Sequence, residues 1–570
     1  MIIKIKYLLT KSMAVFSKTE VLKNPLVTVI VLSALLYSCN SKNPVITSID
    51  PKIGRIGEVI SLSGSNFGAE RGESQVSIAG ITPTSSSYFT WQDNLIRVRT
   101  PESGESGLVY VYVNGKKSNG VLFTNSAGVP RPIEGEELGF EPRITSVNTR
   151  AGAPGTLITI TGNNFGASRE NSLQAMCGVF FSWEYASPAI NPFIVKEPEF
   201  IEVSETEMGY VSWNPREITV RLPDGAASGN FEIRTPRGKS RPVYFDVSGR
   251  PGTKTFKEKR SYTISYSVDI KVQEAARPNT LYLWIPQPIH SPSQRNVNLV
   301  SCSIDPFVKN YREVNLFKLE NLSSGSNTTV NLSFHVEVYS QETSIMPLSI
   351  KENEASPLSV YTQSTNLIPC GNPIIKALAD NITGREKNPY NKARLLYNWI
   401  ITDMHITPAG AADKYAAAGN ITAAAEQKQS DPLTAVLLYT AMARAAGLPC
   451  IPVAGVLASR SGQTIRHYWA EFWIEDFGWI PVDPLMGARA VPDSFIIKQD
   501  LVNYYFGSLD SQRIAFSRGE PVLSQMDSRG RLVSHTQLYS LQNVWEEAVG
   551  GLESYSSFWG DITITGIYVQ

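Results

Sequence analysis

Apolar and polar residues alternate over several long stretches of this chain. From Tyr262 to Val272 every second residue is apolar, which is the period of a β-strand with one buried face. Residues 281–288 and 330–338 supply two further strands. Residues 44–248 are rich in β-branched residues that alternate between Gly-Asn turns, as in small antiparallel sandwiches. The pattern therefore predicts a mainly β chain.

Helical spacing replaces this alternation between Leu433 and Arg444, where apolar residues recur every three or four positions. Ser430 and Asp431 are both good N-cap residues. Pro432 suits the first helical position, because the N–H that proline lacks has no helical partner there. Gly447 closes the helix. The pattern therefore predicts a capped helix that begins at Pro432.

Three strands are predicted after this helix, and two of them bring polar residues suited to catalysis. His467 lies on the second strand, and Asp483 lies at the end of the third. A thiolate forms easily beside an imidazole at a helix N-terminus, and an aspartate can hold that imidazole in the right tautomer. A helix N-terminus, a histidine and an aspartate are therefore the parts of a Cys-His-Asp hydrolase or acyl-transfer site.

The same region resembles the transglutaminase-like family, a branch of the papain-like fold. The resemblance rests on three motifs, ARAAGLP, HYWAEFWI and GWIPVDP, at residues 443–449, 467–474 and 478–484. In that family the nucleophilic cysteine opens the helix, twelve residues before the arginine of the first motif. That arginine is Arg444 here, and the nucleophile position falls on Pro432. The resemblance implies a vestigial His467–Asp483 pair without its nucleophile.

Three other residues are candidates for a role at this site, and a fourth, Cys450, can be set aside. Ser430 is the alternative nucleophile, because it lies two positions upstream of Pro432, although helix capping is its commoner role. Cys450 follows the far end of the helix, about 15 to 20 Å from its start, which makes it unsuitable as the nucleophile. Trp469 and Glu471 lie on the strand of His467 and are candidate ligand contacts.

An internal repeat occupies residues 44–248. Residues 44–68 match residues 142–166 at an offset of 98, and later blocks match at an offset of 122. The second copy therefore holds 24 extra residues, placed near 187–208, where an aromatic-rich loop is a candidate binding region. Both copies resemble the IPT/TIG domain, an immunoglobulin-like module that serves as a spacer or as a binding platform.

The N-terminus has the composition of a secretory signal. Lysines precede an apolar run from Pro25 that ends at Cys39 and is short for a membrane span. Residues 36–39, LYSC, resemble a bacterial lipobox, which implies that Cys39 is lipidated and anchors the mature chain in a membrane. An uncleaved anchor helix is the alternative.

Composition narrows the possible functions further. The 52 basic and 52 acidic residues give a formal net charge of zero, which argues against nucleic-acid binding. The four later cysteines have no spacing typical of metal ligands, and no cofactor is expected. They could form disulfides in three pairings, but buried thiols are favoured. These four cysteines are Cys177, Cys302, Cys370 and Cys450.

We therefore expect a multidomain, mainly β chain: two immunoglobulin-like IPT/TIG sandwiches, a further β-sandwich and an α+β transglutaminase-like core. The expected divisions are a signal peptide (1–38), a lipidated tether (39–43), the first IPT/TIG domain (44–125), a linker (126–142), the second IPT/TIG domain (143–248), a sandwich (256–355), the core (356–490) and its C-terminal extension (491–570).

The expected function is binding of a protein, peptide or glycan by an inactive transglutaminase-like domain on an exported lipoprotein. Its location would be the outer membrane or cell surface of a Gram-negative bacterium. The alternative is an active peptidase or amidase that uses Ser430, with His467 as general base and Asp483 orienting it. A purely structural spacer is the third possibility.

Overall fold

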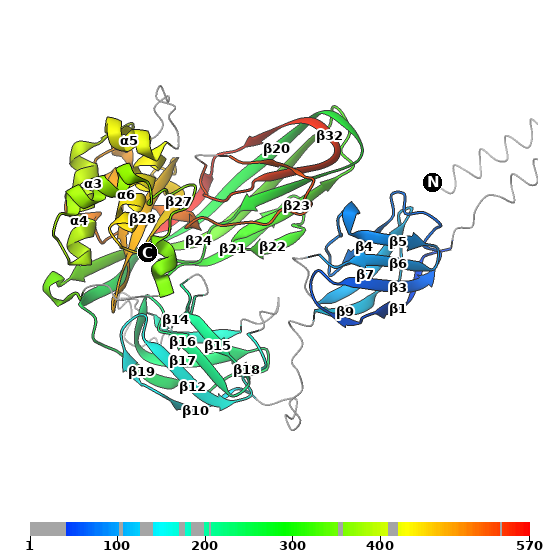
Figure 1. Ribbon diagram of the computed structural model, residues 1–570, viewed down its shortest axis with the longest axis horizontal. Helices are drawn as coiled ribbons and strands as arrows, with labels where there is room; N and C mark the ends of the chain where they lie inside the picture. Colours follow the sequence, from blue (N-terminus) through cyan, green and yellow to red (C-terminus); the bar gives the residue numbers. More distant parts are fainter. Residues whose placement is uncertain are drawn as a thin grey trace, which may run out of the picture. The chain divides into compact units, whose positions relative to one another are not determined.

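The computed structural model describes residues 42–101, 106–125, 141–169, 177–183, 199–204, 207–351, 357–408, 420–535 and 538–569. The chain divides into two compact units, Met1–Ala127 and Gly128–Gln570, which we describe separately (Figure 1). The predicted signal peptide, Cys39 and most of the predicted linker and insertion loop lie outside the described residues. Within the described residues, no helix is long and apolar enough to cross a membrane.

The first unit is a sandwich of two sheets. One sheet has the order β1-β3-β6-β5, and the other has the order β2-β9-β7-β4 with β8 paired to β7. Alternate residues such as Ile60, Leu62 and Val109 fill the core between the sheets. The strands are β1 (Val45–Asp50), β2 (Ile53–Gly54), β3 (Val59–Ser65), β4 (Gln75–Ile78), β5 (Tyr88–Gln92), β6 (Leu95–Arg99), β7 (Gly107–Val113), β8 (Lys116–Lys117) and β9 (Val121–Asn125).

The second unit begins with a sandwich that repeats this topology. Its sheets are β10-β12-β16-β15 and β11-β19-β17-β13-β14, with β18 paired to β17. The repeat extends to side chains: Trp91 and Trp213 each donate an indole hydrogen bond to a phenylalanine carbonyl in their own copy. The strands are β10 (Arg143–Val147), β11 (Ala151–Gly152), β12 (Leu157–Asn163), β13 (Gly178–Trp183), β14 (Phe200–Glu202), β15 (Tyr210–Trp213), β16 (Glu217–Arg221), β17 (Ala226–Thr235), β18 (Gly238–Lys239) and β19 (Val243–Val247).

A large sheet built on one very long strand follows. Strand β20 pairs with β24, β23, β32 and β33, and its alternating apolar residues are buried as the pattern predicted. Residues 491–570, the predicted extension of the core, are divided: β30 pairs with β27 of the core sheet, whereas β31, β32 and β33 join the sheet of β20. Figure 1 shows β32 beside β20. The strands are β20 (Gly252–Pro286), β21 (Gln294–Cys302), β22 (Val308–Tyr311), β23 (Val314–Glu320), β24 (Asn327–Ile345), β31 (Arg531–Val533), β32 (Glu546–Trp559) and β33 (Thr563–Val569).

The α+β core lies between these strands in the sequence. The antiparallel sheet β29-β28-β27-β30 packs against α6, whose residues are buried along most of its length. The elements are α3 (Pro373–Thr383), α4 (Pro389–Asp403), β25 (His405–Ile406), α5 (Ile421–Gln427), β26 (Gln429–Ser430), α6 (Pro432–Ala445), β27 (Cys450–Ala458), β28 (Thr464–Ile474), β29 (Gly478–Val482), α7 (Pro484–Gly487), α8 (Leu501–Tyr504) and β30 (Arg513–Arg518).

Buried ionic contacts join the second sandwich to the core. The Lys254 ammonium donates to Asp224 Oδ1 at 2.6 Å and to the Trp479 carbonyl at 2.7 Å. Arg518 of β30 contacts Glu207 at 3.0 Å. These charged groups are almost completely buried. Separating the domains would therefore break their ion pairs. The contacts therefore hold the second unit together.

Candidate functional site

The first turn of α6 has the backbone that the sequence predicts, with Pro432 at its first position. Asp431 is the N-cap: its carboxylate accepts from the Thr434 backbone N–H at 2.9 Å and from the Thr434 hydroxyl at 2.5 Å. Ser430 lies one residue earlier, at the end of β26, and does not cap the helix. Its hydroxyl oxygen is buried and has no hydrogen-bond partner among the described residues.

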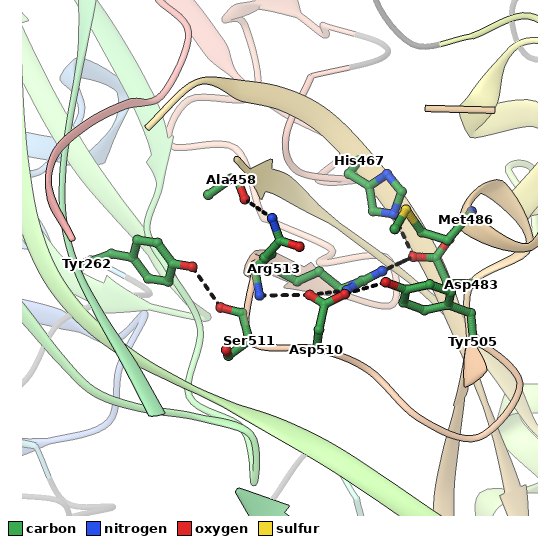
Figure 2. Close-up of polar contacts among 10 residues, drawn as sticks. Tyr262, Ala458, His467, Asp483, Met486, Tyr505, Asp510, Ser511 and Arg513 are labelled. Carbon is green, nitrogen blue, oxygen red and sulfur yellow. Dashed lines mark hydrogen bonds and ion pairs between the residues drawn. The ribbon is translucent and has the colours of Figure 1, made fainter. Parts of the chain in front are cut away.

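His467 and Asp483 form a buried pair, as the sequence predicts for neighbouring strands. His467 Nε2 lies 2.7 Å from Asp483 Oδ2, and neither side chain is exposed to solvent (Figure 2). Asp483 also caps α7, because its Oδ1 accepts from the Met486 N–H at 3.0 Å. Both oxygens of the carboxylate therefore have hydrogen-bond partners.

Arg513 is a third member of this site that sequence reasoning missed. Its Nε and Nη2 donate to Asp483 Oδ2 at 3.1 and 2.6 Å, and its Nη1 forms an ion pair with Asp510 Oδ1 at 2.7 Å (Figure 2). The Tyr505 hydroxyl donates to the other Asp510 oxygen at 2.5 Å. The signal available in the sequence was the pair of charged residues Asp510 and Arg513, which lie close together after the predicted core.

These contacts decide the ionisation of Asp483. Burial alone would raise the pKa of the carboxyl, but His467 and Arg513 outweigh burial and lower the pKa of Asp483 to about 2. Burial likewise opposes ionisation of Asp510, and Arg513 with the Tyr505 hydroxyl lowers the pKa of that group. At neutral pH, Arg513 therefore lies between two carboxylates.

Among the described residues, no nucleophile is hydrogen-bonded to the His467–Asp483 pair. His467 Nδ1 is buried and has no hydrogen-bond partner among the described residues, whether hydroxyl, thiol or other. Pro432 brings neither a nucleophilic atom nor a backbone N–H to the helix start. Acyl transfer through a Cys-His-Asp relay needs a thiol or hydroxyl bonded to the imidazole. In the part of the chain that is described, that relay is incomplete.

Trp469 and Glu471, the predicted ligand contacts, both interact with other residues of the protein. Trp469 is almost fully buried, with its ring stacked near that of His467. Glu471 accepts a 2.7 Å hydrogen bond from Arg518, the arginine that also contacts Glu207 of the second sandwich. Glu471 is therefore part of the contact between domains, and a ligand role for either residue stays a prediction.

The thiols also lie apart from the pair. Cys450 opens β27, and burial raises the pKa of its thiol to about 12. Such a thiol is not a nucleophile at neutral pH. Cys177 and Cys370 are buried as well, and Cys302 is half-buried. Within the described ranges, no group of histidine, cysteine and carboxylate side chains is arranged to hold a metal ion.

Comparison with known families agrees with the two resemblances. Residues 376–484 match the transglutaminase-like superfamily. Residues 44–125 and 142–179 match the IPT/TIG domain. The first range runs from within α3 to just past the end of β29 and includes both His467 and Asp483.

Individual relatives are distant. An uncharacterized protein of Haemophilus influenzae is 24% identical over 304 residues, which is 45% of this chain and 78% of that protein. A cysteine protease candidate from Cytophaga hutchinsonii is 13% identical, with a TM-score of 0.33, over 56% of this chain and 92% of its own. SGBP-B from a xyloglucan utilization locus in Bacteroides uniformis is 11% identical, with a TM-score of 0.13, over 52% and 99% of the two chains.

Proposed function

We propose, for a chain that combines IPT/TIG domains with a transglutaminase-like domain, that the transglutaminase-like domain binds rather than transfers acyl groups. The observation that carries the proposal is the nucleophile position. Pro432 fits the first turn of α6, while His467 and Asp483 keep the geometry of a relay pair. The domain thus retains its fold and lacks the atom that its chemistry requires.

The ligand class that we propose is a protein, peptide or glycan, bound at the surface of an exported lipoprotein anchored through Cys39. The composition supports this choice, because zero net charge disfavours nucleic acid. Replacement of Cys39 by serine should abolish incorporation of radiolabelled palmitate and release the chain from membranes. Continued labelling of the Cys39→Ser chain would contradict the anchor.

Restoring the nucleophile tests whether the site is intact. In the chain lacking residues 1–39, the Pro432→Cys variant should react with a thiol-directed electrophile at position 432, as located by mass spectrometry. The Pro432→Cys, His467→Gln double variant is the control and should react more slowly, because the imidazole assists thiolate formation. Equal reaction of the two variants would show that His467 does not serve that position.

Binding is tested directly with the same truncated chain. Arrays of peptides and of purified polysaccharides should identify a ligand whose affinity falls in a variant at the transglutaminase-like domain, such as His467→Gln. A chain that binds no member of either array would favour the spacer role and contradict the proposal.

An enzyme that uses Ser430 is the second candidate. The observation that favours it is the buried, unpartnered Ser430 hydroxyl in a domain where His467 Nδ1 is also unpartnered. A fluorophosphonate probe should then label the chain, and Ser430→Ala should abolish labelling. Absence of labelling in the folded chain would exclude the serine mechanism and leave the binding role.

A further inference from the structure

The junction between the second sandwich and the core contains more buried carboxyl groups than cations. Glu207 and Asp224 come from the loops of the second sandwich that follow β14 and β16. Glu471 of β28 and Arg518 of β30 come from the core, and Lys254 comes from β20. We call these five residues the junction cluster. Their side chains are between 2% and 18% exposed. With three ionised carboxylates and two cations, the cluster would carry one net negative charge away from water.

The ion pairs inside the junction cluster are divided unevenly. Lys254 Nζ lies 2.6 Å from Asp224 Oδ1, so this cation serves one carboxylate. Arg518 serves two: its Nη1 lies 3.0 Å from Glu207 Oε1, and its Nε lies 2.7 Å from Glu471 Oε2. These two carboxylates belong to different domains. Burying both beside one guanidinium is unfavourable unless one of them takes up a proton.

Glu207 is the carboxyl group best placed to take up that proton. Burial raises the pKa of Glu207, and Arg518 lowers it. The negative charges of Asp224 and Glu471 raise this pKa further, so its net shift is upward. A separated second sandwich would return the Glu207 carboxyl to water and remove these effects. The docked arrangement therefore holds the proton more tightly than the separated one.

Two further titratable groups lie near the junction cluster. Tyr361 packs edge-on against Trp479, and burial raises the pKa of its hydroxyl, so this group is uncharged at neutral pH. Glu313 lies between β22 and β23, and burial outweighs Arg518 and raises the pKa of this carboxyl to about 7. Because Glu313 belongs to the large sheet and not to the second sandwich, it offers a control for titration near the same arginine.

We propose that the second sandwich docks on the core through a proton-dependent junction, in which protonated Glu207 favours the docked arrangement and ionised Glu207 favours separation. Because the docked state binds the proton more tightly, docking is strongest in mild acid and weakens as the pH rises through the pKa of the buried carboxyl. Separation would also expose Glu471, one of the predicted ligand contacts. This junction would operate whether the transglutaminase-like domain binds a ligand or transfers acyl groups.

Energy transfer between two dyes tests the proposal on the chain lacking residues 1–39. The dyes are attached through Val211→Cys on the second sandwich and Val502→Cys on the core, both exposed positions, in a Cys302→Ser background. Transfer efficiency should fall as the pH rises from 5 to 8, because separated domains lie farther apart on average. Glu207→Gln, whose amide resembles the protonated carboxyl, should keep the efficiency near its pH 5 value throughout. Glu313→Gln is the matched control and should follow the parent curve.

A second variant covers the case in which Glu207→Gln does not fold, as judged by circular dichroism. Glu471→Gln removes the excess charge from the core side and should flatten the curve, because Arg518 then pairs with Glu207 alone. A parent chain whose transfer efficiency is constant from pH 5 to 8 would overturn the proposal. Glu207→Gln and Glu471→Gln chains that follow the parent curve would overturn it as well, and so would a loss of pH dependence in the Glu313→Gln chain.

Discussion

Arg513 donates two hydrogen bonds to Asp483 Oδ2, the same oxygen that lies 2.7 Å from His467 Nε2. A carboxylate that serves an imidazole in acyl transfer orients it and stabilises its charged form. Here the Asp483 charge is shared with a guanidinium that is always protonated. Arg513 holds the pair in place. Its guanidinium also offsets part of the negative charge of Asp483 that would otherwise stabilise a protonated His467.

The first prediction concerns removal of that arginine. Arg513→Gln leaves Asp483 and Asp510 buried without their guanidinium and should lower the free energy of unfolding by about 3 to 5 kcal/mol. Urea unfolding followed by tryptophan fluorescence measures the change. The control is Arg466→Gln, because Arg466 pairs with Asp561 at the surface and its loss should cost about 1 kcal/mol or less. Similar losses in the two variants would contradict the structural role of Arg513.

The second prediction is a dependence of stability on pH. The pKa of Asp483 is about 2 when folded and 3.8 ordinarily, so the unfolded chain holds the proton more tightly. The resulting stabilisation, about 2 kcal/mol, is complete above pH 4 and is lost as the pH falls toward 2. Urea midpoints measured from pH 5 to 2 should fall more steeply for wild type than for Asp483→Asn, which cannot be protonated there. Parallel curves would show that Asp483 makes no such contribution.

The third prediction tests the junction between the second sandwich and the core. Gly478 has φ +103°, and a Cβ there would lie 2.3 Å from Asp224 Oδ1, the oxygen that accepts from Lys254. Gly478→Ala should therefore lower the free energy of unfolding by about 3 kcal/mol, from backbone strain plus the displaced ion pair. Gly447→Ala is the control, because Gly447 has φ +82° with open space around it, and its cost should stay near 1 kcal/mol. Equal losses of unfolding free energy in the two variants would mean that Asp224 moves aside without destabilising the protein.

The fourth prediction concerns the reactivity of Cys450. Burial raises the pKa of its thiol to about 12, so iodoacetamide at neutral pH should leave it unmodified in the folded chain. The same reagent in urea should modify it fully, which serves as the internal control. Peptide mass spectrometry distinguishes the two states. Modification of Cys450 in the folded chain would show that β27 opens to solvent.

Local signals in the sequence were sufficient for the helix and strands around the site. The N-cap residue type at Asp431, the proline at 432 and the glycine at 447 set the limits of α6, because capping and proline act within one turn. Strict alternation likewise predicted β20, whose apolar side chains are all on one buried face between Tyr262 and Val272. The choice between the two N-cap candidates was not settled by residue type, since Ser430 and Asp431 suit the position equally well.

The sequence by itself determined the kinds of domain, their order and the start of α6 at Pro432, because these depend on local pattern and on motifs of nearly fixed spacing. Only the tertiary structure decided that Arg513 shares the Asp483 carboxylate, that Glu471 serves the contact between domains, and that the last strands complete the sheet of β20. Each of these depends on residues far apart in the chain. The burial and pairing of such residues follow from the packing of the whole chain, which local sequence patterns do not predict.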